Sequence, residues 1–283
     1  MAGSQAHIRG IPVIFVRHGQ STNNTILEPL FMKEARGEIT RDERERLWGE
    51  NRVDDPELTE KGVAEARALG KYLKEALNFG ESKSRNLHIY TSAFKRTLDT
   101  TKGIIESFDA DEYKVQVRPD IFETGGVYII NDKNLRDGPG KCFSAADISS
   151  LYKGYDTSLL PVQGPWYVDG WENDTKSRER AYKVSNWIKS DEFRNMHNSH
   201  FVVFVMHGNF IDHLQKAILN IPGDPNLDSS TTNDHNVQAV SFGTPNSATS
   251  LFTIFGNGRV SCRHIGGVDH LALAPNESAF SRI

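Results

Sequence analysis

The run Phe201-Val202-Val203-Phe204-Val205-Met206 is the most apolar stretch of the chain, and His207-Gly208 follows it directly. An unbroken apolar run with several β-branched side chains predicts a strand that is buried on both faces, as in a parallel sheet. The run is far shorter than the roughly 20 apolar residues that span a bilayer. We therefore expect it to be a central strand of a soluble α/β domain.

A second strand of this kind is predicted at 12–16, where Pro12-Val13-Ile14-Phe15-Val16 leads directly into Arg17-His18-Gly19. Thr59 and Ser92 are predicted to be N-caps of helices. Further strands are predicted at 87–90, 115–118, 237–242, 250–255 and 259–264, and further helices over 177–193 and after 208. This alternation predicts a three-layer α/β/α sandwich with a mostly parallel central sheet.

The 283 residues are long enough for one or two domains, and we expect a single domain over 8–271 with a C-terminal tail over 272–283. Two segments break the alternation, at about 25–55 and 124–171. Both begin just after the carboxyl end of a predicted strand, where open α/β sheets bind ligands. We interpret them as cap insertions over that edge of the sheet. A solvated helix and an ordinary surface loop are the alternative interpretations.

Composition narrows the class of partner and the compartment. With 33 basic and 37 acidic residues the formal charge is −4, which gives no support to a nucleic-acid or membrane partner. Cys142 and Cys262 are too few for a disulfide framework, and no apolar leader is visible, so we expect a cytoplasmic protein. The final Ser281-Arg282-Ile283 only loosely resembles a peroxisomal signal. The oligomeric state is not predicted.

Positively charged and imidazole side chains follow the predicted strands where they end. Arg17-His18-Gly19 follows one strand, His207-Gly208 follows another, and Arg96 lies on the helix after the strand at 87–90. Because parallel strands end at one edge of the sheet, two imidazoles and two guanidiniums are expected to converge there. Such a set suits a dianionic phosphoryl group.

These residues also fall in motifs that resemble those of the histidine phosphatase (phosphoglycerate mutase-like) superfamily. Arg17-His18-Gly19-Gln20-Ser21 with Asn24 is similar to the family's R-H-G-[E/Q]-[T/S]-x-x-N signature. The other similar elements, in order, are Pro56-Glu57-Leu58-Thr59-Glu60-Lys61-Gly62, Ser92-x3-Arg96-x3-Thr100, Phe122-Glu123 with Gly125-Gly126, and Val205-Met206-His207-Gly208. Each motif is weak alone, whereas the ordered set is specific and covers most of residues 11–271.

The resemblance implies a role for each matching residue. His18 would be the nucleophile that forms a phosphohistidine, with Glu123 as general acid and base. The phosphoryl oxygens would be bound by Arg17, Arg96 and His207, and the substrate also by Asn24, Ser21, Gly208 and Asn246. Asn246 could equally be a turn-forming residue, and Asp132, Asp137 and Asp147 are other candidates for the acid. No metal or other cofactor is implied.

Three functions remain open at this point. The first is a phosphatase acting on a small or medium phosphate monoester. The second is a phosphoglycerate mutase, but mutases of this family carry a Trp-Asn-x3-[Arg/Lys]-Phe-x-Gly-Trp stretch and paired arginines, and here 25–55 replaces the stretch and no Arg-Arg pair occurs. The third is a catalytically inactive binding relative. Lys133, Arg136 and Lys141 in the second insertion form either a reader of a second anionic group or a solvated face.

Overall fold

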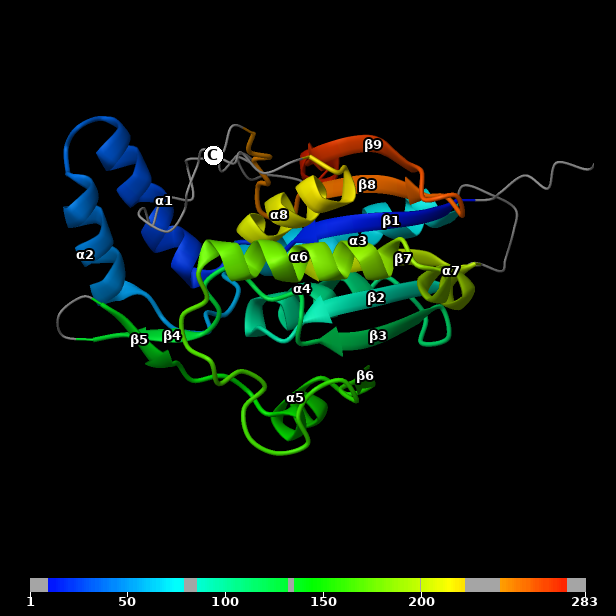
Figure 1. The fold of residues 1–283 in the computed structure, drawn as a ribbon, viewed down its shortest axis with the longest axis horizontal. Helices are drawn as coiled ribbons and strands as arrows, with labels where there is room; N and C mark the ends of the chain where they lie inside the picture. Colours follow the sequence, from blue (N-terminus) through cyan, green and yellow to red (C-terminus); the bar gives the residue numbers. More distant parts are fainter. Residues whose placement is uncertain (1–9, 79–85, 132–134, 199, 222–239, 274–283) are drawn as a thin grey trace, which may run out of the picture.

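The central sheet has seven strands in the order β6-β3-β2-β7-β1-β8-β9 (Figure 1). The structure is a computed structural model that describes residues 10–78, 86–131, 135–198, 200–221 and 240–273. The strands are β1 (Ile11–Arg17), β2 (Leu87–Ser92), β3 (Tyr113–Arg118), β6 (Tyr155–Asp156), β7 (Phe201–Met206), β8 (Thr249–Ile254) and β9 (Val260–Gly267). In this order, all neighbours from β6 to β1 pair in parallel, whereas the β1–β8 and β8–β9 pairs are antiparallel. The expected mostly parallel sheet is therefore confirmed.

Helices cover both faces of this sheet and complete the three layers (Figure 1). A hydrophobic cluster lies on each face of the sheet, and β7 contributes to both. Its side chains with no exposed surface alternate between the two clusters: Val203 and Val205 in one, Val202, Phe204 and Met206 in the other. One face carries α3 (Glu60–Asn78) and α4 (Lys95–Ile105), and the other carries α6 (Asp174–Ile188), α7 (Asp191–His197) and α8 (Gly208–Ile218). None of the helices in the described ranges is long and apolar enough to span a membrane.

The parallel register brings the predicted functional residues to one edge. Arg17 lies opposite Met206, and Thr91 lies opposite Val205. The residues that follow these positions, His18, Ser92 and His207, therefore leave the sheet side by side.

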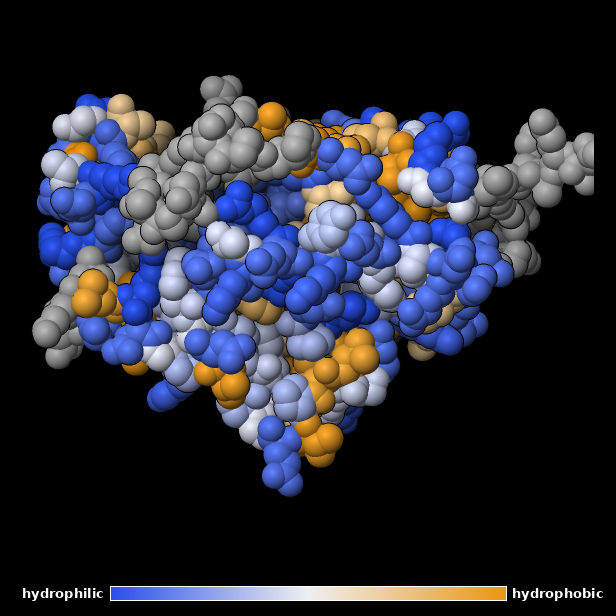
Figure 2. Space-filling model, in the orientation of Figure 1, coloured by the Kyte–Doolittle hydropathy of each residue, from blue (hydrophilic) through white to orange (hydrophobic). Residues whose placement is uncertain are grey.

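The first insertion is a helical hairpin that stands beyond this edge. It consists of α1 (Thr22–Ala35) and α2 (Arg41–Asn51), and it lies beside the small hairpin of β4 (Tyr128–Ile130) and β5 (Arg136–Pro139) from the second insertion (Figure 1). The rest of the second insertion adds a strand to the central sheet, which the sequence did not predict. After α5 (Ala145–Leu151), β6 pairs with β3 and extends the central sheet. On the face drawn in Figure 2, apolar side chains gather over this α5–β6 part.

Several local predictions need correction. The helix expected over 177–193 is two helices, because the Ser190 hydroxyl accepts from Phe193 N and caps α7. Ser92 ends β2 and caps nothing, since Phe94 is the N-cap of α4. Of the strand expected at 237–242, residues 240–242 are not in a strand and 237–239 lie outside the described residues. Asp132, Lys133 and 281–283 also lie outside them.

Candidate active site

His18 follows β1 directly and is almost fully buried, with 3% of its surface exposed. Its Nδ1 lies 2.7 Å from the Gly19 carbonyl oxygen, and its Nε2 lies 3.1 Å from Arg96 Nε. Since a carbonyl only accepts and a guanidinium only donates, the ring carries its proton on Nδ1 and its lone pair on Nε2. Burial, with the charges of Arg96 and Arg17, holds the pKa of His18 well below its usual range. The ring is therefore neutral, with a nucleophilic nitrogen at Nε2.

The loop after His18 is held by backbone contact with α3. A Cβ on Gly19 would lie 2.5 Å from the Gly62 carbonyl oxygen, so this close approach requires glycine. The Gly19 N–H donates to Thr100 Oγ1 at 3.0 Å, and the Gln20 N–H donates to Glu65 Oε2 at 2.8 Å. The motifs at 56–62 and 92–100 thus act locally by fixing the loop that carries His18.

Two buried guanidiniums flank the imidazole. Arg17 Nη1 donates to the Thr244 carbonyl at 2.7 Å, while its Nε has no partner among the described residues. A Cβ at Gly208 would lie 3.3 Å from Arg17 Nε, so a larger residue at this position would crowd the guanidinium group. Burial lowers the pKa of Arg96 to about 10, with Asp55 and Glu123 opposing that shift. Both side chains remain cationic at neutral pH.

His207 lies against His18, with 5.4 Å between the ring centroids, and has no exposed surface. Its Nε2 is 3.0 Å from the Ser92 hydroxyl, and its Nδ1 has no partner in the part of the chain that the structure describes. Burial, reinforced by Arg96, holds the pKa of His207 well below its usual range. When the Ser92 hydroxyl donates to Nε2, Nδ1 carries the proton and can donate to an anion. The hydroxyl predicted to cap a helix instead orients this imidazole.

Asn24 and Ser21 lie on the cleft wall, whereas Asn246 lies behind it. The Asn24 side-chain oxygen accepts from the Ser21 backbone at 3.0 Å, from the Ser21 hydroxyl at 2.8 Å and from Asn246 Nδ2 at 3.3 Å. This leaves the Asn24 amide nitrogen as its donor. Asn246 Nδ2 also donates to the His18 carbonyl at 3.1 Å, so the expectation that Asn246 binds substrate needs correction. In the structure, Asn246 instead holds the loop that carries His18.

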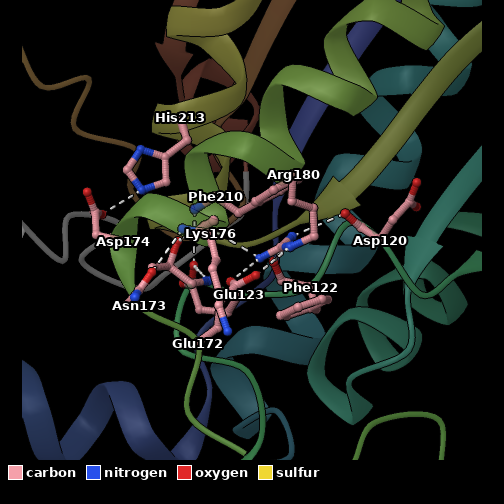
Figure 3. A network of polar contacts seen from close by, with 12 residues as sticks. Asp120, Phe122, Glu123, Glu172, Asn173, Asp174, Lys176, Arg180, Phe210 and His213 are labelled. Carbon is pink, nitrogen blue, oxygen red and sulfur yellow. Dashed lines mark hydrogen bonds and ion pairs between the residues drawn. The ribbon is translucent and has the colours of Figure 1, made fainter. Parts of the chain in front are cut away.

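Glu123 also lines the cleft, and Figure 3 shows it among the polar contacts around it. Its Oε1 accepts from the Thr124 N–H at 2.9 Å and from the Phe210 N–H, in the first turn of α8, at 3.1 Å. These bonds fix the carboxyl group and leave Oε2 for a ligand. Among the alternative acids, Asp137 and Asp147 do not line the cleft, so Glu123 is the acid that the geometry favours.

The loop around Glu123 is clamped by a pair that the sequence analysis missed, Arg180 and Glu172. Arg180 Nη1 donates to the carbonyls of Asp120 and Phe122 at 3.1 and 3.0 Å, on the N-terminal side of Glu123 (Figure 3). Its other nitrogens bind both oxygens of Glu172 at 3.0 and 2.6 Å. The Glu172 N–H donates to the Gly125 carbonyl at 3.0 Å, on the C-terminal side. A charged residue beside Ala181 on the helix's buried side was the available signal.

Asp55 is a second carboxyl group that the sequence analysis missed. Its Oδ1 accepts from the Lys95 N–H at 2.9 Å, at the start of α4. Burial raises the pKa of Asp55 to about 7, with the charge of Arg96 opposing that shift. Asp55 and Arg96 therefore lie close enough for their charges to interact.

The cleft has a volume of about 430 Å³ and two unlike walls. The wall formed by the sheet edge holds His18, the guanidiniums, Glu123 and Gly208. The wall formed by the two insertions holds aromatic rings and further arginines, namely Phe31, Trp48, Arg52, Tyr128, Arg136 and Trp171. Among the described residues, no group of three or more His, Cys, Asp or Glu side chains is placed to hold a metal ion.

Comparisons with known proteins agree with this arrangement. Residues 13–127 match the family model of the histidine phosphatase superfamily (branch 1). The chain is 28% identical over 179 residues to the broad-range acid phosphatase DET1 of Saccharomyces cerevisiae, a match covering 50% of this chain and about half, 52%, of that relative. It also resembles the crystal structure of the ecdysone phosphate phosphatase of Bombix mori in complex with tungstate, with 15% identity, 90% and 93% coverage of the two chains and a TM-score of 0.55. That likeness concerns the fold. The ordered motifs and the matching family model thus make residues 13–127 of this chain similar to the histidine phosphatase superfamily (branch 1).

Proposed function

We propose that this chain is a phosphomonoester hydrolase that forms a phosphohistidine at His18 Nε2. The observation that carries the proposal is the fixed tautomer of His18: its Nδ1–H donates to the Gly19 carbonyl, and Nε2 keeps its lone pair beside Arg96, in a side chain that lines the cleft. A neutral imidazole between two cations is suited to attack an anionic phosphoryl group that the same cations bind.

In the first step, the Nε2 lone pair attacks phosphorus and the bond from phosphorus to the ester oxygen breaks. Glu123, in its protonated form, gives its proton to that oxygen, so an alcohol leaves. Arg17, Arg96 and His207 donate to the three peripheral oxygens, and Asn24 and Ser21 lie beside them on the wall. The positive charge of Arg17 and Arg96 carries out what a divalent metal does in other phosphoryl-transfer sites, so we propose that no metal takes part.

In the second step, water attacks the phosphorus of the phosphohistidine. Glu123, now a carboxylate, takes the water proton, the N–P bond breaks, and its electron pair returns to Nε2. Inorganic phosphate leaves, and both residues regain their starting states. A mutase would instead pass the phosphoryl group to a second alcohol.

The test is to trap the intermediate with a ³²P-labelled phosphate ester and to locate the label. We expect alkali-stable, acid-labile label on His18, and turnover lowered by at least about 10³-fold in the His18→Ala variant. The matched control is His264→Ala, which removes a histidine on β9 away from the cleft. Substantial activity in a folded His18→Ala protein would overturn the mechanism.

Two further measurements test the rest of the proposal. Activity should survive EDTA, and vanadate should inhibit because it mimics the five-coordinate phosphoryl group. Phosphate released to water should equal ester consumed even with added alcohol acceptors. Loss in EDTA with recovery on Mg²⁺ would contradict the metal-free mechanism, and transfer to the acceptor would favour the mutase.

A further inference from the structure

We propose that the wall opposite His18 binds a leaving group that carries both a flat ring and a second anionic group. This inference rests on the proposed function, because it takes the phosphoryl group to lie against His18. We call this surface the cap wall, and define it by Trp48, Arg52, Tyr128, Arg136 and Trp171, all of which line the cleft.

Aromatic rings and guanidiniums alternate along the cap wall. The guanidinium carbon of Arg52 lies 4.2 Å from the centroid of the Tyr128 ring, and that of Arg136 lies 3.8 Å from the centroid of the Trp171 ring. Tyr128 and Trp171 meet edge to face with 4.8 Å between centroids. Because these contacts join α2's C-terminal end, β4, β5 and the segment before α6, they form one continuous surface.

Stacking has a consequence for what the arginines can bind. A guanidinium donates in its own plane, so one that lies flat on a ring keeps its N–H edge for another partner. Arg52 uses Nη1 on the Tyr128 carbonyl at 2.9 Å and on Asp54 at 3.4 Å. Among the described residues, in contrast, the ion pair of Arg136 is a loose one with Glu45 at 3.8 Å, which is too long for a hydrogen bond. Arg136 is therefore the donor that the fold holds in place and leaves available to an anion.

The rings supply the second half of the recognition. The Trp48 side chain is half-buried on the same wall, next to Arg52, whose guanidinium carbon is 5.9 Å from its ring centroid. A planar ring entering between such groups gains stacking on aromatic faces and on guanidinium planes. A linear or purely aliphatic ester gains neither contact.

The size of the cleft agrees with a substrate of this kind. Its volume of about 430 Å³ lies in the range of pockets that enclose a whole small molecule. A phosphoryl group at His18 would fill only part of this volume, so the rest is open to the leaving group. The chemical class is a phosphate monoester of a ring-bearing alcohol with another anionic group.

Four substrates separate the effect of the flat ring from that of the second anionic group. Ribose 5-phosphate has neither feature, and adenosine 5′-monophosphate has only the flat ring. Fructose 1,6-bisphosphate has only the second anionic group, and adenosine 3′,5′-bisphosphate has both. We expect kcat/KM to be highest for the last. Arg136→Gln should lower the advantage of the second anion by about 10-fold, the value of one charge-assisted hydrogen bond. Trp48→Leu should lower the advantage of the ring by about 2- to 10-fold.

Arg259→Gln is the matched control, because Arg259 also lies over a ring, Phe255, but on the β8–β9 turn away from the cleft. Equal kcat/KM for the four substrates, or equal losses for all four in Arg136→Gln, would overturn the inference while leaving the hydrolase intact. If the wild type hydrolyses none of the four substrates, the inference is tested by calorimetry, which measures the binding of adenosine 3′,5′-bisphosphate to the His18→Ala protein. Weaker binding on adding Arg136→Gln supports the cap wall, and unchanged binding overturns it.

Discussion

Two groups of histidines stand at opposite ends of the parallel strands of the sheet. His18 and His207 follow the carboxyl ends of β1 and β7, whereas His88 lies at the start of β2 and His197 shortly before β7. Burial lowers the pKa in both groups, to about 4 for His88 and about 3 for His197. On that property alone the two groups look equally suited to chemistry.

Their surroundings separate them. His18 has a guanidinium nitrogen 3.1 Å away and lies in a cleft that also holds Glu123. His197 bonds the Tyr90 hydroxyl at 2.9 Å and packs on the Phe193 ring, with His88 edge-on beside it. A shifted pKa thus reports burial, and it indicates catalysis only where charged partners and an open cleft accompany it. The following predictions, from the largest expected effect to the smallest, test this contrast.

Glu123→Gln should have the largest effect, and the effect should depend on the leaving group. The amide keeps the shape but has no proton to give, and such catalysis is worth about 10²–10⁴ in rate. An alkyl phosphate needs the proton, whereas a nitrophenyl phosphate expels a stable phenolate. We expect kcat/KM to fall by this factor for alkyl esters and far less for nitrophenyl phosphate. Equal losses would mean that Glu123 only positions the phosphate.

Arg96→Met should lower kcat/KM by about 10²–10³-fold for every ester, since it removes a donor to the transferred group. It also removes a charge that lowers the pKa of His18. The pKa of His18 should therefore rise, and the acid limb of the pH–kcat/KM profile should move to higher pH. Arg67→Met, which removes an exposed arginine of α3 paired with Glu106, is the control. An unmoved acid limb would contradict the assignment of His18.

Arg180→Lys should lower kcat/KM by about 10-fold, with the same preference for alkyl esters as Glu123→Gln but a smaller size. Lysine keeps the charge and loses the fork that holds Glu172 and the two carbonyls before Glu123. Glu172→Gln should not add its full effect to Arg180→Lys, because the two residues act as one clamp. Equal losses for alkyl and aryl esters would show that the clamp serves stability alone.

His197→Gln should change activity least and pH-dependent stability most. In the wild type the folded pKa values of His88 and His197 lie below the unfolded value of about 6.5, so the unfolded state binds more protons between about pH 6.5 and 4. Stability is therefore lost as the pH falls through that window. The variant should show a flatter Tm against pH there, with kcat/KM near wild type at neutral pH. A large loss of activity would break the contrast between the two groups.

The sequence predicted the parts of the site that local patterns encode. His18, Arg17 and His207 follow unbroken apolar runs. Because parallel strands have their carboxyl ends at the same edge of the sheet, these residues are expected to lie together there. Arg96 was predictable for the same reason, because it is in the first turn of the helix that follows β2.

Contacts across the chain were not predictable in this way. Arg180 meets carbonyls 58 and 60 positions away, and its position on the buried side of α6 does not indicate which groups it contacts. The Ser92 hydroxyl was predicted to cap a helix, whereas its partner in the structure is the distant His207. Asn246 was placed in the cleft by resemblance, but its amide is taken by His18 and Asn24.

The two-residue strand β6 of the second insertion is the edge strand of the central sheet. It pairs with Val115 and Gln116 of β3, and the Gln116 amide donates to Asp156 at 2.7 Å. Without it, β3 would present a row of unpaired N–H and C=O groups, which is a template for strands of other molecules. Removing 124–171 to open the cleft would therefore yield a protein that self-associates through β3. The same insertion that lines the cleft thus shields part of this sheet edge.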